Sequence, residues 1–88
     1  MADDNFLPDG SLIEDYILSN RKKIGESLRE LREVKGFNQE QLAEIMKISR
    51  TTISKIENGK FNCSVDYLSK FSWFLRFEIK LEDKSLRL

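Results

Sequence analysis

Donor side chains and small hydroxyls gather between residues 49 and 60, and they are the residues of this chain best suited to binding a ligand. Arg50, Thr51, Ser54 and Lys55 would share the outward face of a short helix, because residues about four positions apart lie on one side of a helix. Such groups bond to base edges or phosphates, and an α-helix fits the major groove of B-DNA. The alternative is a solvated polar face with no partner.

Other chemistries are poorly supplied. The chain contains no histidine, which is the usual general base near neutral pH and the commonest metal ligand. A Cys–His pair or a zinc cluster therefore cannot form within one chain. The four glycines, at positions 10, 25, 36 and 59, are too scattered for a phosphate-binding loop. We expect no enzyme activity, no catalytic residue, no cofactor and no metal site.

Length and composition predict one small soluble domain. The chain has 88 residues, of which 40% are hydrophobic and 34% charged. Its apolar runs are at most three residues long, so we expect neither a membrane span nor a secretory signal. One cysteine, Cys63, cannot form an intramolecular disulfide. These features predict a cytoplasmic protein without a membrane partner.

The formal net charge of zero conceals a segregation of charge along the chain. Residues 1–19 contain five acidic and no basic side chains, and residues 20–60 contain ten basic and six acidic ones. The chain thus combines an acidic N-terminal leader with a basic middle. This is consistent with a DNA-binding core, although sorted surface charge alone would also explain it.

The first helical region is predicted between residues 11 and 36. Ser11 and Glu14 form a capping-box pattern, and Gly36 is placed to end the helix. Apolar residues recur at helical spacing between these ends: Leu12, Ile13, Tyr16, Ile17, Ile24, Leu28, Leu31 and Val34. We expect a break at Ser19-Asn20, and the pattern leaves open whether there is one helix or two.

Three further helices and a strand follow. Asn38 and Gln41 predict a capping box, Ser49 caps the next helix, which ends at Asn58-Gly59, and Ser64 caps another. Ala43 is the small residue that a steep crossing of two short helices requires. Apolar residues predicted to pack inward are Leu42, Ile45, Met46, Ile48, Ile53, Ile56, Val65, Leu68, Phe71, Trp73, Phe74 and Leu75. For Phe71, Trp73 and Phe74 the alternative is an aromatic patch that faces a partner. After Arg76 the apolar period becomes two, which predicts a strand.

Residues 24–60, IGESLRELREVKGFNQEQLAEIMKISRTTISKIENGK, resemble the helix-turn-helix domain of the Cro and repressor (XRE) family. The similarity extends over residues 20 to about 75. It implies a mainly all-α, lambda-repressor-like fold of four to five helices, with a short C-terminal β-strand. The expected domains are an acidic leader with a short helix at 1–19, the helix-turn-helix domain at 20–75, and a dimerisation strand and tail at 76–88.

The resemblance also implies roles for individual residues. Arg50, Thr51 and Lys55 match positions that read bases, although Lys55 could contact phosphate instead. Arg32 and Glu57 match a structural ion pair that joins the first and third helices. Positions that match phosphate contacts are Asn38, Gln39, Ser49, Thr52, Ser54, Asn58 and Lys60. Ser49 is needed first as an N-cap.

Two positions depart from the family pattern. Lys47 stands in the interhelical turn where the family usually has glycine, and positive φ there costs a lysine about 1 kcal/mol. Arg76 replaces a glycine that often precedes the C-terminal strand.

Phe77, Ile79 and Leu81 form one face of the predicted strand, whose unpaired edges favour pairing with a second copy. The alternative is a strand that folds back on its own domain. A two-fold dimer would place two recognition helices about 34 Å apart and match an inverted repeat.

The sequence therefore predicts a transcriptional regulator, in particular a repressor, that binds double-stranded DNA as a homodimer through the helix at 49–58. The alternative is an antitoxin that binds a toxin protein and represses its own operon.

Overall fold

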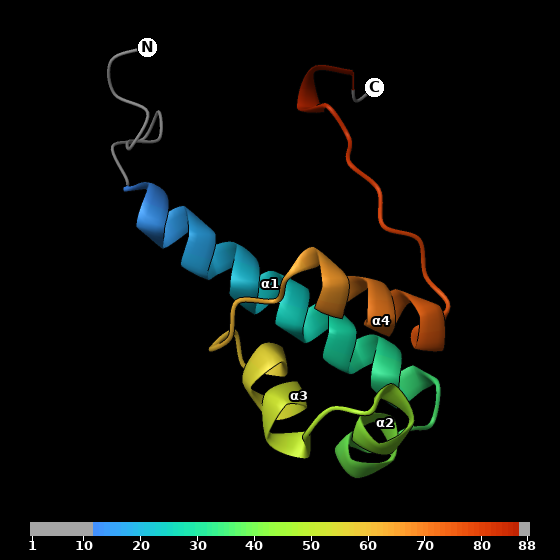
Figure 1. Ribbon diagram of the computed structural model, residues 1–88. Helices are drawn as coiled ribbons and strands as arrows, with labels where there is room; N and C mark the ends of the chain where they lie inside the picture. Colours follow the sequence, from blue (N-terminus) through green and yellow to red (C-terminus); the bar gives the residue numbers. More distant parts are fainter. Residues whose placement is uncertain (1–11, 87–88) are drawn as a thin grey trace.

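The computed structural model describes residues 12–86, which form four α-helices and a short 3-10 helix (Figure 1). The α-helices are α1 (Ile13–Val34), α2 (Gln39–Met46), α3 (Arg50–Glu57) and α4 (Val65–Leu75), and the 3-10 helix is Lys84–Leu86. The helices α2 and α3 lie at one end of the molecule, with α4 alongside the second half of α1 (Figure 1). The predicted mainly all-α fold is confirmed.

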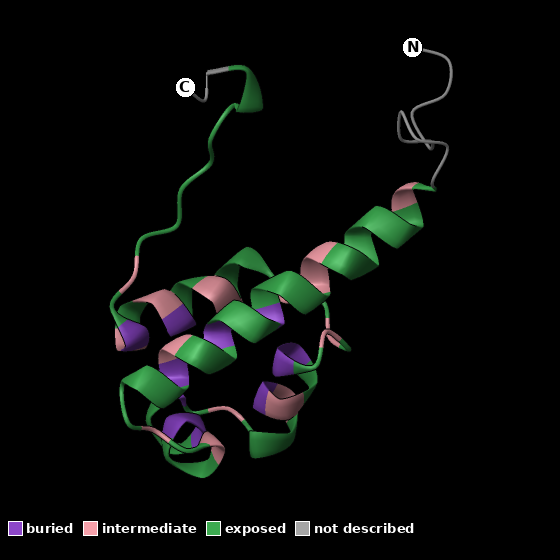
Figure 2. Ribbon diagram, turned by 180° about the vertical axis from the view of Figure 1, so that it is seen from behind, coloured by how far each residue is buried: buried purple, intermediate pink, exposed green. Residues whose placement is uncertain are grey.

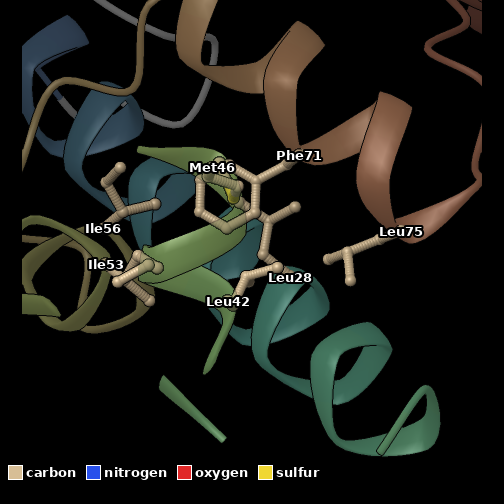
Figure 3. Packing of buried hydrophobic residues seen from close by; sticks show 8 residues of the cluster. Leu28, Leu42, Met46, Ile53, Ile56, Phe71 and Leu75 are labelled. Carbon is tan, nitrogen blue, oxygen red and sulfur yellow. The ribbon is translucent and has the colours of Figure 1, made fainter. Parts of the chain in front are cut away.

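The core lies where all four helices meet (Figure 3). Phe71 and Leu75 of α4 close it over Leu28 of α1, and α2 and α3 supply the remaining side chains. The buried set is Leu28, Leu42, Ala43, Met46, Ile53, Ile56, Phe71 and Leu75. Several residues of the predicted apolar sets are exposed instead: Leu12, Tyr16, Ile17, Ile24, Val34, Ile45, Val65 and Trp73. Periodicity gives the face of a helix on which a residue lies, but not whether another helix covers that face.

Helix α1 is continuous, so the break predicted at Ser19-Asn20 is wrong. Serine and asparagine lower helix propensity by less than about 1 kcal/mol each, which is too little to interrupt a helix of 22 residues. The helix has Leu12 as its N-cap without a side-chain bond. The predicted cap at Ser11 and the leader residues before it lie outside the described residues, whereas residues 13–19 of the leader belong to α1.

The first half of α1, residues 13–24, extends beyond the other helices, and we call it the projecting half (Figures 1 and 2). It contains no buried residue, whereas the second half buries Gly25, Leu28 and Arg32. The helix meets α3 at Gly25. A Cβ atom there would overlap the backbone of α3, since the carbonyl oxygen of Glu57 would lie only 2.6 Å away.

Side-chain caps fix the other helices as predicted. The Asn38 Oδ1 accepts from the Gln41 backbone N–H at 2.7 Å, and the Gln41 Oε1 accepts from the Asn38 N–H at 2.9 Å. Ser49 caps α3 and Ser64 caps α4, each accepting from the backbone N–H three residues later. Gly36 follows α1 with φ +85°, a conformation that glycine adopts without strain.

The predicted C-terminal strand is not formed within the described residues. Residues 77–83 have no regular secondary structure, and Arg76 turns the chain away from α4 with φ 61°. Alternating side chains favour an extended backbone, but a strand also needs a hydrogen-bonding neighbour. The residues after Phe77 leave the body of the molecule (Figure 1).

Candidate nucleic-acid interface

The turn between α2 and α3 sets the angle at which α3 is presented. Lys47 ends α2 in the left-handed conformation, with φ 60° and ψ 42°, which confirms the positive φ expected there. Its backbone N–H bonds to the carbonyls of Ala43 and Glu44. Half-buried Ile48 packs against the core, and Ser49 then begins α3. Only three residues separate the two helices.

The three candidate base-reading residues lie on the exposed side of α3. Arg50, Thr51 and Lys55 are exposed, while Ile53, Ile56 and Glu57 are buried on the opposite side. Lys47 and Lys60 are exposed at the two ends of this segment. The acidic residue of α3, Glu57, is buried and paired, so the exposed formal charges between residues 47 and 60 are all positive.

The candidate phosphate-contacting residues flank this face, and several already have intramolecular partners. The hydroxyls of Ser49 and Thr52 share a hydrogen bond of 2.8 Å, so both belong to the N-terminal cap. The Asn58 amide turns back and donates to the Ser54 carbonyl at 2.9 Å. Lys60 donates through its backbone N–H to the Lys55 carbonyl at 2.8 Å. For Ser49, Thr52 and Asn58, these bonds give a structural role in the unbound protein.

A buried ion pair joins α1 to the end of α3. Arg32 Nε donates to Glu57 Oε2 at 2.7 Å, and Nη2 donates to Oε1 at 3.1 Å. The remaining Nη1 donates to the carbonyl of Phe37 at 2.8 Å, which ties down the loop before α2. The hydrogen bond to Glu57 raises the pKa of Arg32, against the opposing effect of burial. Because arginine is already charged at neutral pH, the pair is present throughout the physiological range.

Gln39 connects this buried pair to the exposed face of α3. Its Nε2 donates to Glu57 Oε1 at 3.0 Å, and its Oε1 accepts from Arg50 Nη1 at 3.3 Å. The second bond is long, so it biases the position of Arg50 without fixing it. A shallow cavity of about 390 Å³ opens beside these groups, lined by Arg32, Asn38, Gln39, Glu40 and Arg50. The N-terminus of α2 and a guanidinium therefore face one recess, an arrangement that suits a phosphate.

The double role of Gln39 was not predicted from the sequence. A glutamine at the start of a helix carries no signal for a bond to Glu57, which lies 18 residues away. The predicted pair of Arg32 and Glu57 could have pointed to a further donor. A carboxylate accepts more hydrogen bonds than the two that Arg32 donates to Glu57, so capacity for another donor remains.

The three candidate dimerisation residues have different environments. Phe77 is half-buried against the core, Ile79 is 47% exposed and Leu81 is 99% exposed. All three line one apolar cavity of about 500 Å³ along α1 and α4, together with Ile24, Leu31 and Leu68. The segment thus presents apolar side chains next to an open groove.

Residues 12–86 contain no group of histidine, cysteine and carboxylate side chains able to hold a metal. Nor does any of their helices have the length and apolar character to cross a bilayer. Burial raises the pKa of the Cys63 thiol, which lowers its reactivity.

Two short helices in this arrangement, with a cationic outer face on the second, define a DNA-binding protein of the helix-turn-helix class. A family model described as a helix-turn-helix domain matches residues 25–80, well over half of the chain. The chain therefore belongs to the helix-turn-helix domain family and is of the Cro/XRE type.

Similar proteins have related descriptions. The HTH-type transcriptional activator BcrR of Enterococcus faecalis is 42% identical over 57 residues, which are 65% of this chain but 28% of that protein. The ImmF control region 10 kDa protein of Bacillus phage phi105 is 30% identical over 60 residues, 68% of this chain and 67% of that one.

A solved structure agrees in fold. The restriction-modification controller protein C.AhdI from Aeromonas hydrophila matches with a TM-score of 0.65 and 35% identity, over 68% of this chain and 91% of that one.

Proposed function

We propose that this protein is a sequence-specific transcriptional repressor that binds an inverted-repeat operator as a homodimer. The observation that carries the proposal is the exposed face of α3, where Arg50, Thr51 and Lys55 point outward and the exposed formal charges between residues 47 and 60 are all positive. An α-helix with such a face fits the major groove, where arginine bonds guanine and hydroxyls bond several bases.

In this proposal Arg50 and Thr51 read bases from the start of α3, and Lys55 reads a base or a phosphate one turn later. Phosphates are held around this helix by Asn38, Gln39, Ser49, Thr52, Ser54, Asn58 and Lys60. The recess beside Gln39 supports a phosphate at the N-terminus of α2. Gln39 would then bond the phosphate while it orients Arg50, and the bond to Glu57 would keep its side chain in place.

The dimer in this proposal uses the segment after Arg76. Ile79 and Leu81 are exposed beside an apolar groove, and their backbone is extended, which suits pairing with the same segment of a second copy. Repression follows if the occupied operator overlaps a promoter. The similar proteins are described as a controller protein, a phage control-region protein and a transcriptional activator, which supports a role in gene regulation, and none of the three is described as an antitoxin.

Selection of genomic DNA fragments by the purified full-length protein tests the proposal. We expect the selected fragments to share an inverted repeat with half-site centres one helical turn apart, about 34 Å. Placing this repeat over a reporter promoter should lower expression when the protein is present. Selected fragments without a shared sequence would contradict sequence-specific binding. Raised reporter expression would contradict repression and show that the protein is an activator.

A further inference from the structure

The projecting half of α1 carries an apolar stripe of which no residue is buried. Ile13, Ile17, Asn20 and Ile24 recur at intervals of four, three and four residues, so they share one face of the helix. Tyr16 lies beside them. Tyr16, Ile17 and Ile24 are 43%, 44% and 40% exposed, respectively. Intervals of four and three are the spacing with which one helix packs along another.

The charges beside this stripe are self-complementary. Glu14 and Arg21 are one heptad apart and lie on the same flank. Suppose that two copies align their projecting halves antiparallel, with the two-fold axis between residues 18 and 19. Ile13 of each copy then meets Ile24 of the other, and Ile17 meets Asn20. In this register each Glu14 lies next to Arg21 of the second copy, twice in one interface.

We propose that the projecting half of α1 is a docking surface for a second copy of this chain, joined as an antiparallel helix pair in this register. The complementary charges favour a second copy over an unrelated partner, because one sequence supplies both signs at matching distances from the axis.

The domain leaves space beside the projecting half for the N-terminal end of α1 of the second copy. A cavity of about 210 Å³ opens where the stripe meets the rest of the domain. Its lining is mixed, with apolar Ile17, Ile24, Ile56 and Phe61 beside polar Asn20, Arg21 and Asn62. In the proposed register the second copy's Ile13 reaches the apolar side of this cavity. The matched segments are 12 residues long, or about 18 Å, so the interface is small and its dissociation constant should be micromolar.

The surface shares no residue with the exposed face of α3, so the inference is independent of the proposed DNA contacts. It shares Ile24 with the apolar groove beside the segment after Arg76. If both interfaces form, the projecting halves connect one dimer to another.

Analytical ultracentrifugation of the full-length protein between about 5 and 200 μM tests the apolar stripe. Ile17→Asp should weaken association at least tenfold. The matched control is Leu18→Asp, because Leu18 is 50% exposed, close to the 44% of Ile17, but lies outside the stripe. We expect this control to associate like the natural protein. No change with Ile17→Asp, or an equal loss with both variants, would overturn the proposal.

A charge exchange tests the partner and the register. Glu14→Arg and Arg21→Glu should each weaken self-association, because each places like charges together. An equimolar mixture of the two variants should associate at least as tightly as the natural protein, since both pairs are restored in the mixed complex. A mixture that associates no better than either variant alone would contradict the register. Circular dichroism and binding to a DNA half-site should stay unchanged throughout, which separates a failure here from a failure of the proposed function.

Discussion

The α2–α3 unit differs from the projecting half of α1 in how its residues are held. Side chains cross between elements throughout the first region: Arg32 reaches Glu57, Gln39 reaches both Glu57 and Arg50, and Ile53 and Ile56 lie in the common core. The projecting half has no buried residue and exposes Tyr16, Ile17 and Leu18. One region is organised before it meets a partner, and the other is an exposed apolar surface.

This difference teaches what each region is suited to do. Side chains that are ordered in the unbound protein lose less entropy on binding, so an organised α3 favours specific contacts with DNA. An apolar helix face without a neighbour gains most from another apolar face. The substitutions below test whether the side-chain contacts between helices account for the free energy of unfolding.

The largest effect is expected from the buried ion pair. Arg32→Met should lower the free energy of unfolding by about 3–5 kcal/mol, because it leaves the Glu57 carboxylate buried without its arginine. Arg29→Met is the matched control, since Arg29 is 60% exposed and pairs with Glu33 at 3.6 Å. Its loss should stay below about 1 kcal/mol. Urea denaturation measures both values, and equal losses would contradict a special role for the buried pair.

The junction between the two halves of α1 should be the next most sensitive point. Gly25→Ala should lower the free energy of unfolding by about 1–3 kcal/mol, because the added Cβ overlaps the backbone of α3. The sign of this change in the free energy of unfolding separates two explanations. Without that overlap, alanine would stabilise the helix by about 1 kcal/mol. Exposed Ser27→Ala on the same helix should be neutral or slightly stabilising, and a gain in stability for Gly25→Ala would refute the close approach.

A smaller gain is expected in the turn. Lys47→Gly should raise the free energy of unfolding by about 0.5–1 kcal/mol, because it removes the strain of a lysine with φ 60°. Lys35→Gly serves as the comparison, since Lys35 ends α1 with φ −81° and carries no such strain. It should be neutral or destabilising. Thermal unfolding measures the stability of both variants. A similar change in stability for the two would contradict a strained turn.

Sequence reasoning succeeded where structure depends on neighbouring residues. The caps at Asn38, Ser49 and Ser64 follow from side-chain chemistry within one turn of chain. The positive φ of Lys47 was implied by the resemblance to the Cro and repressor family, which usually has glycine at this position. Sequence reasoning also placed Arg50, Thr51 and Lys55 on an outward face, because the helical period fixes which positions lie opposite Ile53 and Ile56.

It failed where structure depends on distant partners. The alternation of Phe77, Ile79 and Leu81 predicts a strand, yet pairing depends on a neighbour that the pattern does not supply. The exposure of Val65 and Trp73 likewise depends on how many helices surround α4. The two hydrogen bonds of Gln39 depend on how α2 lies relative to both ends of α3, which no local pattern encodes.

The most direct test of the central claim compares Arg50→Ala with Arg29→Ala, which removes an equal charge from an exposed site on α1. Fluorescence anisotropy would measure binding of both variants to a selected operator and to the same DNA with its sequence scrambled. We expect Arg50→Ala to weaken operator binding by about 1–3 kcal/mol, or about 5- to 150-fold, with little more effect on scrambled DNA than Arg29→Ala. Equal losses on both DNAs would make Arg50 a phosphate contact, and no loss on the operator would contradict recognition through α3.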